Sequence, residues 1–248
     1  MIFSIITVTF NAGKVLEQTI LSVVNQTCPH IEYIIVDGNS SDNTKEIIKK
    51  YEPAISHWIS EPDAGLYDAM NKGLHIATGD YVWFLNAGDV IQNGNIAAEL
   101  ANIAEKHQMP DILYGDTNLI DSNGNIIAER RLKTPKALTW KSFRMGMLVC
   151  HQAFIVRRKI AEEYDLRYRF SADFEWCIRC MKSAKTIINT HLLLINYLYE
   201  GLTTANRKVS LKERHAIMCK YYGVVITDIL HIWFAVRYYW AKWTNGII

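Results

Sequence analysis

Acidic residues stand where several apolar runs of this sequence end. Asp37 follows the run at 31–36, and Asp89 follows the run at 81–85 after three small residues. A carboxylate in such a place can ligate a hard divalent cation, and the cation can hold phosphate oxygens. A second carboxylate along the same crevice can take a proton from a nucleophile. This combination suits displacement at a carbon atom that bears a diphosphate leaving group. The candidate acids are Asp37, Asp63, Asp68, Asp89, Asp173 and Glu175.

Motifs of other common enzyme classes are missing from the sequence. It has neither glycine-rich phosphate-binding pattern, GxxxxGK[ST] or GxGxxG, and no HExxH zinc motif. It also lacks the GxSxG motif that carries the nucleophilic serine of many serine hydrolases. Cys177 and Cys180 form a CxxC, but no second CxxC completes a zinc site. We interpret this pair as two small apolar residues one helical turn apart.

The elements that must position these acids alternate along the first 90 residues. Apolar, β-rich runs predict strands at 2–9, 31–36, 56–60 and 81–85, and helical spacing predicts helices at 15–25 and 67–77. Asn43 followed by Glu46 resembles a capping box that opens another helix. Such alternation indicates a mostly parallel sheet flanked by helices, with ligands beyond the carboxyl ends of the strands. The polar clusters TFN, DGNSSD and NAGD should therefore converge on one crevice.

The pattern changes after residue 111. The stretch 111–131 predicts two strands joined by an Asn-Gly turn, and 148–158 predicts a further strand. A helix is expected at 171–184, followed by β-type runs at 186–201. We interpret this half as packing on the first half and completing one composite domain.

Composition limits the classes of function. The chain has 248 residues, half of them hydrophobic, and a net charge of +2, which argues against a general nucleic-acid binder. Five scattered cysteines and no signal-peptide pattern predict a reduced, cytoplasmic setting.

The charge gathers at the C-terminal end. From residue 201 onward seven Lys or Arg stand against two acids, which gives this segment +5. Its stretch HIWFAVRYYWAKWTNG combines aromatic and basic residues, including Lys242 and Trp243, and this mixture suits a membrane interface. Asp228 and His231 interrupt the apolar run upstream, so a spanning helix is not expected. The alternative is a helix that packs its aromatics on the catalytic domain or on a second subunit, as in a homodimer.

A resemblance to a known family joins these observations. The opening SIITVTFNAGKVLEQTILSVVNQTCPHIEYIIVDGNSSDNT, then EPDAGLYDAMNKGLHIATGDYVWFLNAGD, then SADFEW resemble the family 2 glycosyltransferases, which have the GT-A fold. The likeness covers roughly the first 185 residues and is most specific over the first 90. EPDAGLYDAMNKG is similar to a branch that adds single sugars during bacterial surface-polysaccharide synthesis.

The resemblance implies an organisation. Residues 1–205 would form the α/β GT-A catalytic domain, with a Rossmann-like nucleotide-sugar-binding half at 1–110 and an acceptor half at 111–205. Residues 206–248 would be a C-terminal helical, aromatic and basic extension. The protein would be cytoplasmic, with peripheral contact at the inner face of the cytoplasmic membrane.

The resemblance also implies roles for single residues. Thr9 and Asn11 would approach the nucleotide, and Asp37 would face its base or ribose. Asp89 would hold Mg²⁺ or Mn²⁺ on the diphosphate. Asp173 matches the second residue of the family's Glu-Asp pair, the catalytic base, and Ala172 replaces the Glu. The donor pocket would be bordered by Asp63, Asp68, Asn71 and Lys72, and His151 would touch phosphate or acceptor.

The sequence departs from the family at two places. The common Leu-Asp-Ser-Asp-Asp is Leu-Asn-Ala-Gly-Asp here, so that Asp89 alone remains of the carboxylates. The small residues before it would let a diphosphate and its cation approach the backbone. The usual Asp-Asp-Gly is Asp-Gly-Asn, which changes the contacts to the base. Simpler roles remain open: Asp37 as a turn cap, Asp173 as a first-turn acid with Glu175 as the rival base, and His151 as a core histidine.

The expected function is inverting transfer of a single sugar from a nucleotide-diphosphate sugar, expected to be a UDP-sugar. The acceptor would be a hydroxyl of a lipid-linked glycan. A sugar nucleotidyltransferase is the alternative enzyme, although the single Gly and Lys of TFNAGKVLEQ disfavour it. A GT-A scaffold with weakened catalysis is the third interpretation.

Overall fold

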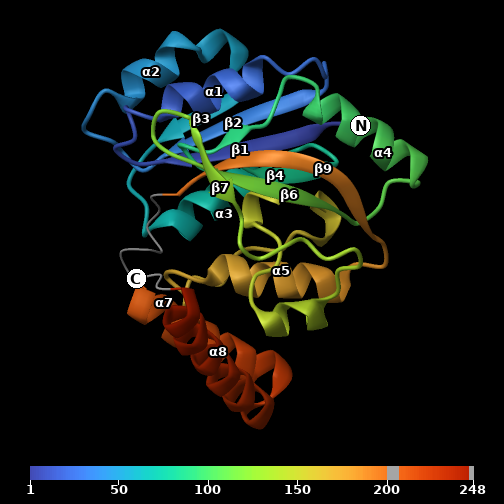
Figure 1. The fold of residues 1–248 in the computed structure, drawn as a ribbon. Helices are drawn as coiled ribbons and strands as arrows, with labels where there is room; N and C mark the ends of the chain where they lie inside the picture. Colours follow the sequence, from blue (N-terminus) through green and yellow to red (C-terminus); the bar gives the residue numbers. More distant parts are fainter. Residues whose placement is uncertain (200–206, 246–248) are drawn as a thin grey trace.

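One twisted sheet organises the molecule (Figure 1). The computed structural model describes residues 1–199 and 207–245, and the expected boundary at 205/206 lies outside them. Within these residues the strand order is β3-β2-β1-β4-β8-β6-β9-β5, and β7 pairs with β6. Helices α1 and α2 lie on one face of the sheet and α3 and α5 on the other, which gives three layers.

The first half is the expected parallel unit. Its strands are β1 (Phe3–Thr9), β2 (Ile31–Asp37), β3 (His57–Ser60) and β4 (Tyr81–Phe84). All three pairings among them are parallel, and Phe3 lies opposite both Ile31 and Tyr81. The connecting helices are α1 (Leu16–Val24), α2 (Thr44–Lys50), the 3₁₀ turn η1 (Glu52–Ala54) and α3 (Leu66–Ile76). Strands β1 and β4 are buried along their whole length, so their continuous apolar runs form the core.

The predicted capping box is wrong in detail. Asn43 is the N-cap residue of α2, but its side chain makes no capping hydrogen bond. Asp42 caps the start of α2 instead. Its Oδ1 accepts hydrogen bonds from the amide and the hydroxyl of Thr44, at 3.0 and 2.5 Å.

The second half extends the sheet with mixed pairing. The first half, residues 1–110, also contains β5 (Val90–Ile91) and α4 (Ile96–Lys106), and the second half begins with β6 (Ile112–Ile120) and β7 (Ile126–Glu129). Strands β6 and β7 form the expected hairpin, and Gly124 of the Asn-Gly turn has a positive φ of 84°. The expected β-type runs after residue 186 are one long strand, β9 (Ile187–Leu198), parallel to β6 and antiparallel to β5.

The stretch predicted as a strand at 148–158 is shorter than expected. It begins with a 3₁₀ turn, η3 (His151–Ala153), and only β8 (Phe154–Arg157) is a strand, followed by η4 (Arg158–Ile160). His151 therefore lies on a turn beneath the sheet. The remaining elements of this half are η2 (Trp140–Met145) and α5 (Ala172–Ser183).

Two helices complete the described chain. α7 (Arg207–Tyr222) and α8 (Val224–Asn245) pack against each other below α5 and η2. Gly223 joins them with a φ of 85° and no atom within 4 Å of where a Cβ would be. No helix in the described part of the chain is both long and apolar enough to cross a membrane. The side chains of Lys242 and Trp243 lie outside those that the structure describes.

Candidate active site

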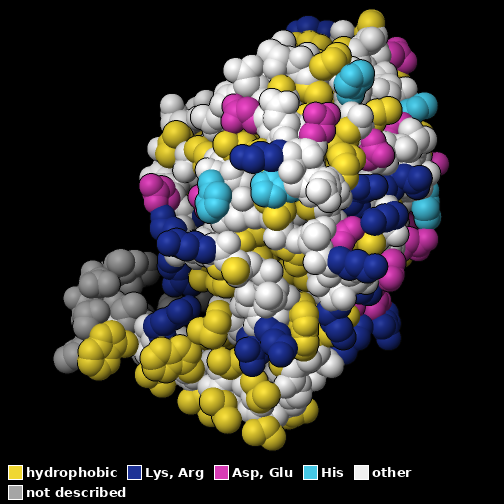
Figure 2. Space-filling view, turned by 90° about the vertical axis from the view of Figure 1, so that its right-hand side faces the viewer, with side chains coloured by type: hydrophobic (Ala, Val, Ile, Leu, Met, Phe, Trp, Pro, Cys, Tyr) yellow, Lys and Arg dark blue, Asp and Glu magenta, His cyan; other side chains and the backbone are white. Residues whose placement is uncertain are grey.

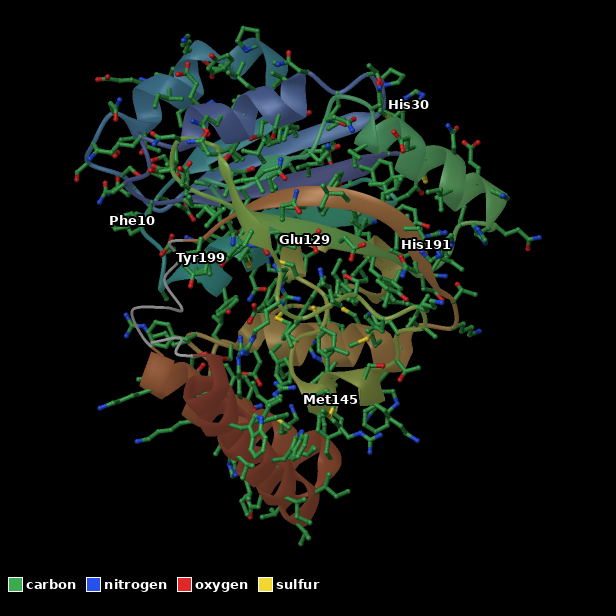
Figure 3. All side chains as sticks on the ribbon, viewed as in Figure 1. Phe10, His30, Glu129, Met145, His191 and Tyr199 are labelled. Atoms are coloured by element: carbon green, nitrogen blue, oxygen red, sulfur yellow. The ribbon has the colours of Figure 1, made fainter. Side chains whose placement is uncertain are left out.

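The polar ends of β1, β2 and β4 meet at one edge of the sheet, as expected for parallel strands. The Gly38 amide donates to the Thr9 carbonyl at 2.9 Å, and the Ala87 amide donates to the Val8 carbonyl at 3.2 Å. Phe10 and Tyr199, which follow β1 and β9, lie on this side of the molecule (Figure 3). The three predicted polar clusters are therefore neighbours.

Asn11 and Asp37 shape the loop after β2. Asn11 has a positive φ of 49°, its amide donates to Ser40 Oγ, and its Oδ1 accepts from the Ser41 amide. Asp37 is 0% exposed, and its carboxylate accepts hydrogen bonds from Ser40 and from Ser60 Oγ. Both side chains are thus committed to protein groups, and contact of Asp37 with a base or ribose stays a prediction.

An open surface lies beside this loop. Phe10 is 64% exposed at the end of β1. A Cβ added at Gly38 would lie 2.4 Å from Asp63 Oδ2 and 3.3 Å from the Phe10 ring, so the three residues border the same space. The sequence analysis missed Phe10. An aromatic residue directly after a buried strand, where the chain turns polar, was the available signal.

The predicted donor-pocket residues on α3 and in the segment before it have internal partners. Asp68 Oδ2 accepts from the Ala64 amide at 3.0 Å, and Asp63 Oδ1 accepts from the Gly65 amide at 2.9 Å. Lys72 Nζ lies 2.8 Å from a Glu61 carboxylate oxygen and donates to the Pro62 carbonyl. These contacts hold the segment 61–65 against the start of α3.

Asn71 lies away from this segment and is buried. Its side-chain amide donates to the Tyr164 carbonyl and its Oδ1 accepts from the Tyr164 amide, so both its polar ends are used. Asn71 thus shares α3 with Asp68 and Lys72 but has other partners, because its hydrogen bonds go to the Tyr164 backbone of the second half.

Asp89 is a buried carboxyl in the turn between β4 and β5, directly before β5. It is 3% exposed, and its Oδ1 accepts a hydrogen bond from the Leu198 amide at 2.9 Å. Burial raises the pKa of Asp89 to about 7, although hydrogen bonds from the Leu198 amide and the Gln152 side chain act in the opposite direction. No Lys, Arg or His within the described residues forms an ion pair with it. This carboxylate is therefore suited to gain a cation.

The residues around Asp89 fit a hard cation only together with a ligand. In the described part of the chain, no group of three or more His, Cys, Asp or Glu could hold a metal ion. However, Thr9 Oγ1 and Asn86 Oδ1, at the ends of the adjacent strands β1 and β4, are buried without a hydrogen-bond partner there. Oxygen donors of this kind suit Mg²⁺ or Mn²⁺, and diphosphate oxygens would complete the coordination.

The small residue before Asp89 has a structural role, and its expected role beside a diphosphate stays a prediction. Gly88 has a φ of 99°, and a Cβ there would lie 2.5 Å from the Leu198 side chain. Its amide donates to Thr19 Oγ1 of α1 at 2.8 Å. Glycine is thus required by the turn and by the close approach of β9, which brings the Leu198 amide onto Asp89.

Asp173 lies in the first turn of α5 and is half-buried. Tyr67 of α3 donates a hydrogen bond from its hydroxyl to Asp173 Oδ1 at 3.0 Å. Burial and the charge of Asp173 raise the pKa of Tyr67 well above its usual range, so that Tyr67 remains a donor. A contact between the two halves of the sequence thus fixes the predicted base.

The charges of Asp89 and Asp173 both raise the pKa of Tyr197 and of Cys150, although the two acids are 84 positions apart in the sequence. The pKa of Tyr197 is raised first by burial and then by the charges of Cys150, Asp89 and Asp173. The pKa of Cys150 is raised to about 11 by burial, and both carboxylates add to this rise. Contacts lead in the same direction: Tyr67, which donates to Asp173, stacks on Tyr164, and the Tyr164 hydroxyl lies 2.6 Å from Nε2 of His151, on the same turn as Gln152.

Glu175, the rival base, has a structural role. It is 1% exposed and pairs with Lys220 at 2.9 Å and with Arg179 at 3.0 Å, and the Tyr221 hydroxyl donates to it at 2.5 Å. Burial raises its pKa, but these partners outweigh burial and the net pKa is lowered. A carboxylate so enclosed holds α5 to α7 and leaves Asp173 as the accessible acid of the pair.

His151 is enclosed by aromatic rings. Its Nε2 lies 2.6 Å from the Tyr164 hydroxyl, and its ring stacks on Phe84 at a centroid distance of 5.4 Å. Burial lowers the pKa of His151 to about 4, so it is neutral near pH 7. This geometry fits the core-histidine interpretation. Its neighbour Gln152 was not predicted from the sequence, and hydrogen bonding by the Gln152 side chain lowers the pKa of Asp89.

The fold and the site define a class of protein. A parallel unit with acids at the carboxyl ends of its strands, extended by a mixed sheet and a second acid on a helix, is the GT-A arrangement of glycosyltransferases. The chain is a member of Glycosyl transferase family 2, because the model of that family matches residues 4–165. It is therefore a glycosyltransferase.

Named relatives agree with this assignment. A PGL/p-HBAD biosynthesis glycosyltransferase of Mycobacterium bovis is 31% identical over 202 residues, which cover 79% of this chain and 76% of the relative. An uncharacterized glycosyltransferase of Methanocaldococcus jannaschii is 30% identical over 186 residues, which cover 72% of this chain and 64% of the relative.

Solved structures support the fold. Residues 1–349 of S. aureus TarS in complex with UDP superpose with a TM-score of 0.71 at 19% identity, over 99% of this chain and 74% of that one. The same protein in complex with UDP-GlcNAc gives a TM-score of 0.69 over 93% of this chain and 70% of that one. The chain spans 44% of the longer TarS structure.

Proposed function

We propose that this enzyme transfers a single sugar from a UDP-sugar to a hydroxyl group with inversion at the anomeric carbon. The observation that carries the proposal is the setting of two acids: Asp173 is held by the Tyr67 hydroxyl at 3.0 Å, and the buried Asp89 carboxyl accepts from the Leu198 amide at 2.9 Å. Complexes of TarS with UDP and with UDP-GlcNAc support the choice of donor, because TarS has the same fold.

Asp173 is the proposed base. Its carboxylate accepts the proton of the acceptor hydroxyl while that oxygen forms a bond to the anomeric carbon. The bond from this carbon to the diphosphate oxygen breaks, and the electron pair leaves with the nucleoside diphosphate. Tyr67 holds Asp173 in place through its 3.0 Å hydrogen bond.

Asp89 is the proposed holder of Mg²⁺ or Mn²⁺, with Asn86 and Thr9 as neighbouring oxygen donors. The cation would neutralise charge on the leaving diphosphate. Gln152 and the Leu198 amide orient the Asp89 carboxylate. Because Asp89 is the only predicted carboxylate ligand, we expect weak metal affinity without the nucleotide.

Phe10, Asp63 and the loop of Asn11 and Asp37 form the proposed nucleotide side of the site. Phe10 offers an exposed ring on which a base can stack, and Asp63 offers a carboxylate beside it. The acceptor is proposed to be a lipid-linked glycan hydroxyl, in the synthesis of a bacterial surface polysaccharide.

The test is a purified enzyme with a panel of UDP-sugars, Mn²⁺ and candidate acceptors. Release of nucleoside diphosphate together with a glycosylated product of inverted configuration supports the proposal. Release of pyrophosphate would indicate nucleotidyl transfer instead, and absence of nucleotide-sugar binding by calorimetry would indicate a scaffold. Full activity in excess EDTA would contradict the role given to the metal.

A further inference from the structure

The outer face of α8 carries a continuous apolar stripe. It consists of side chains at helical spacing that are 52% to 72% exposed. In a soluble monomer, contiguous exposed apolar area of this kind marks an interaction surface. We define the stripe as Val225, Ile229, Ile232, Trp233 and Val236.

The opposite face of α8 is already used by the fold. Thr227 is fully buried, and Leu230 and Phe234 pack against the core. The spacing of these three residues places them about half a turn away from the stripe. The stripe therefore remains on the outside after α8 has docked on the rest of the protein.

Cations lie along one edge of α8, at a groove whose α8 side chains are next to the stripe in sequence but are not part of it. A groove of about 500 Å³ between η2 and α8 is lined by Lys141, Arg144 and Met145 on one side and by Ile226 and Leu230 on the other. Figure 2 shows hydrophobic side chains gathered at the C-terminal end of the molecule, with Lys and Arg side chains next to them. Met145 of η2 points toward the region of α8 (Figure 3).

Two further cations extend this border. Lys182 Nζ lies 5.4 Å from the centroid of the Trp140 ring, and Arg237 lies on α8 itself. Within the described residues, none of the four has a carboxylate within 4.0 Å, whereas Lys220 and Arg179 nearby pair with Glu175. We call this set the basic rim: Lys141, Arg144, Lys182 and Arg237.

We propose that the stripe and the basic rim dock on the surface of an anionic lipid bilayer. An apolar helix face flanked by unpaired cations is complementary to acyl chains below a layer of phosphate groups. The groove joins both chemistries, because two cations and apolar side chains line it together. A second copy of the chain is a poorer occupant, since two-fold pairing of this face would bring basic rims together.

The docking surface is tied to the helix that carries Asp173. On α7, Glu213 accepts hydrogen bonds from the amides of Arg169 and Phe170, just before α5. Lys220 of α7 pairs with Glu175 of α5. A bilayer held by α8 would therefore be held at a fixed orientation to the proposed base.

Binding of the protein to a bilayer can be measured without glycosyl transfer. The full chain is sedimented with vesicles of phosphatidylcholine alone and of phosphatidylcholine mixed with phosphatidylglycerol. We expect binding to the mixed vesicles only, weakened by salt. Lys141→Gln with Arg144→Gln should weaken binding roughly fivefold for each charge removed. Ile232→Ser with Trp233→Ser should weaken it by about tenfold or more.

The control variants remove the same kinds of side chain, cationic and apolar, from surfaces away from α8. Lys49→Gln with Lys106→Gln removes two exposed cations from α2 and α4, and Ile126→Ser with Ile127→Ser changes two exposed apolar residues of β7. Both control variants should bind vesicles like the wild type. Thermal melting of every variant shows that it is folded.

Equal binding to both vesicle types, or equal binding of rim and control variants, would overturn the proposal. If the wild type does not bind vesicles, and sedimentation velocity shows a dimer that Ile232→Ser with Trp233→Ser abolishes, the surface serves self-association instead. Nucleoside diphosphate release from a donor without vesicles is measured separately, so failure of the proposed function leaves the vesicle result intact.

Discussion

The hydroxyl of Tyr67 donates a hydrogen bond to Asp173 across 106 residues of sequence, at 3.0 Å. The bond joins α3 of the first half to α5 of the second half. Tyr67 is buried and stacks on Tyr164, which in turn stacks on Trp176. The proposed base is thus oriented by a rigid aromatic cluster that both halves build.

Tyr67→Phe should therefore reduce kcat about tenfold or more, because one hydrogen bond to a charged group is lost. The KM for the donor should stay near the wild-type value, since Tyr67 does not border the nucleotide side. Steady-state kinetics measure both. Tyr33→Phe is the matched control, because it removes another buried hydroxyl, one that lies 3.2 Å from Thr7 Oγ1. An equal loss of kcat in both variants would contradict the positioning role.

Asp89 should make metal-dependent donor binding depend on pH. Its pKa is raised to about 7 by burial, so protons compete with the cation below that value. We expect affinity for UDP with Mn²⁺ to fall by about tenfold per pH unit below pH 7 and to level off above it. Calorimetry from pH 5 to 8 measures this. Asp89→Asn should bind UDP weakly and without this slope, and an unchanged slope would exclude Asp89 as the titrating group.

Glu175→Gln should destabilise the fold by about 3 kcal/mol, because a buried carboxylate with two cationic partners is neutralised. Its pKa is lowered in the folded state, so its contribution is present above the unfolded pKa near 4.5 and is lost as pH falls through the folded value. Denaturant unfolding at pH 7 and pH 4 measures both effects. The difference between wild type and Glu175→Gln should shrink at the lower pH. A variant that is fully stable at pH 7 but inactive would instead make Glu175 catalytic.

Phe10→Ala should weaken UDP binding by about tenfold, which corresponds to the loss of one base-stacking contact. Phe10→Tyr keeps the ring and should bind like the wild type. Because Phe10 is 64% exposed, neither change should lower the melting temperature much. Equal affinity of all three proteins would place the base elsewhere.

The sequence predicted the parts of the fold that depend on local pattern. Strands such as β1 and β4 are continuous apolar runs, and parallel pairing brings their polar ends together whatever follows. The family resemblance placed Asp89 and Asp173 at those ends and on α5. The strands follow from chain order and period, whereas the roles of Asp89 and Asp173 follow only from the resemblance and stay predictions.

Contacts between distant segments could not be predicted in the same way. Leu198 occupies the space beside Gly88, Gln152 reaches Asp89, and Glu175 is enclosed by Lys220 and Tyr221. Each depends on how β9, η3 or α7 packs on the first half, and no local pattern encodes that packing. For the same reason His151, next to Gln152, was expected in the crevice but is enclosed by rings.

The most direct test of the central claim compares Asp173→Asn with the wild type on a UDP-sugar with Mn²⁺ and a matched acceptor. We predict that Asp173→Asn binds UDP like the wild type by calorimetry but forms product at least about a hundredfold more slowly, as expected when a general base is lost. Turnover near the wild-type rate would contradict the assignment of Asp173 and the mechanism built on it.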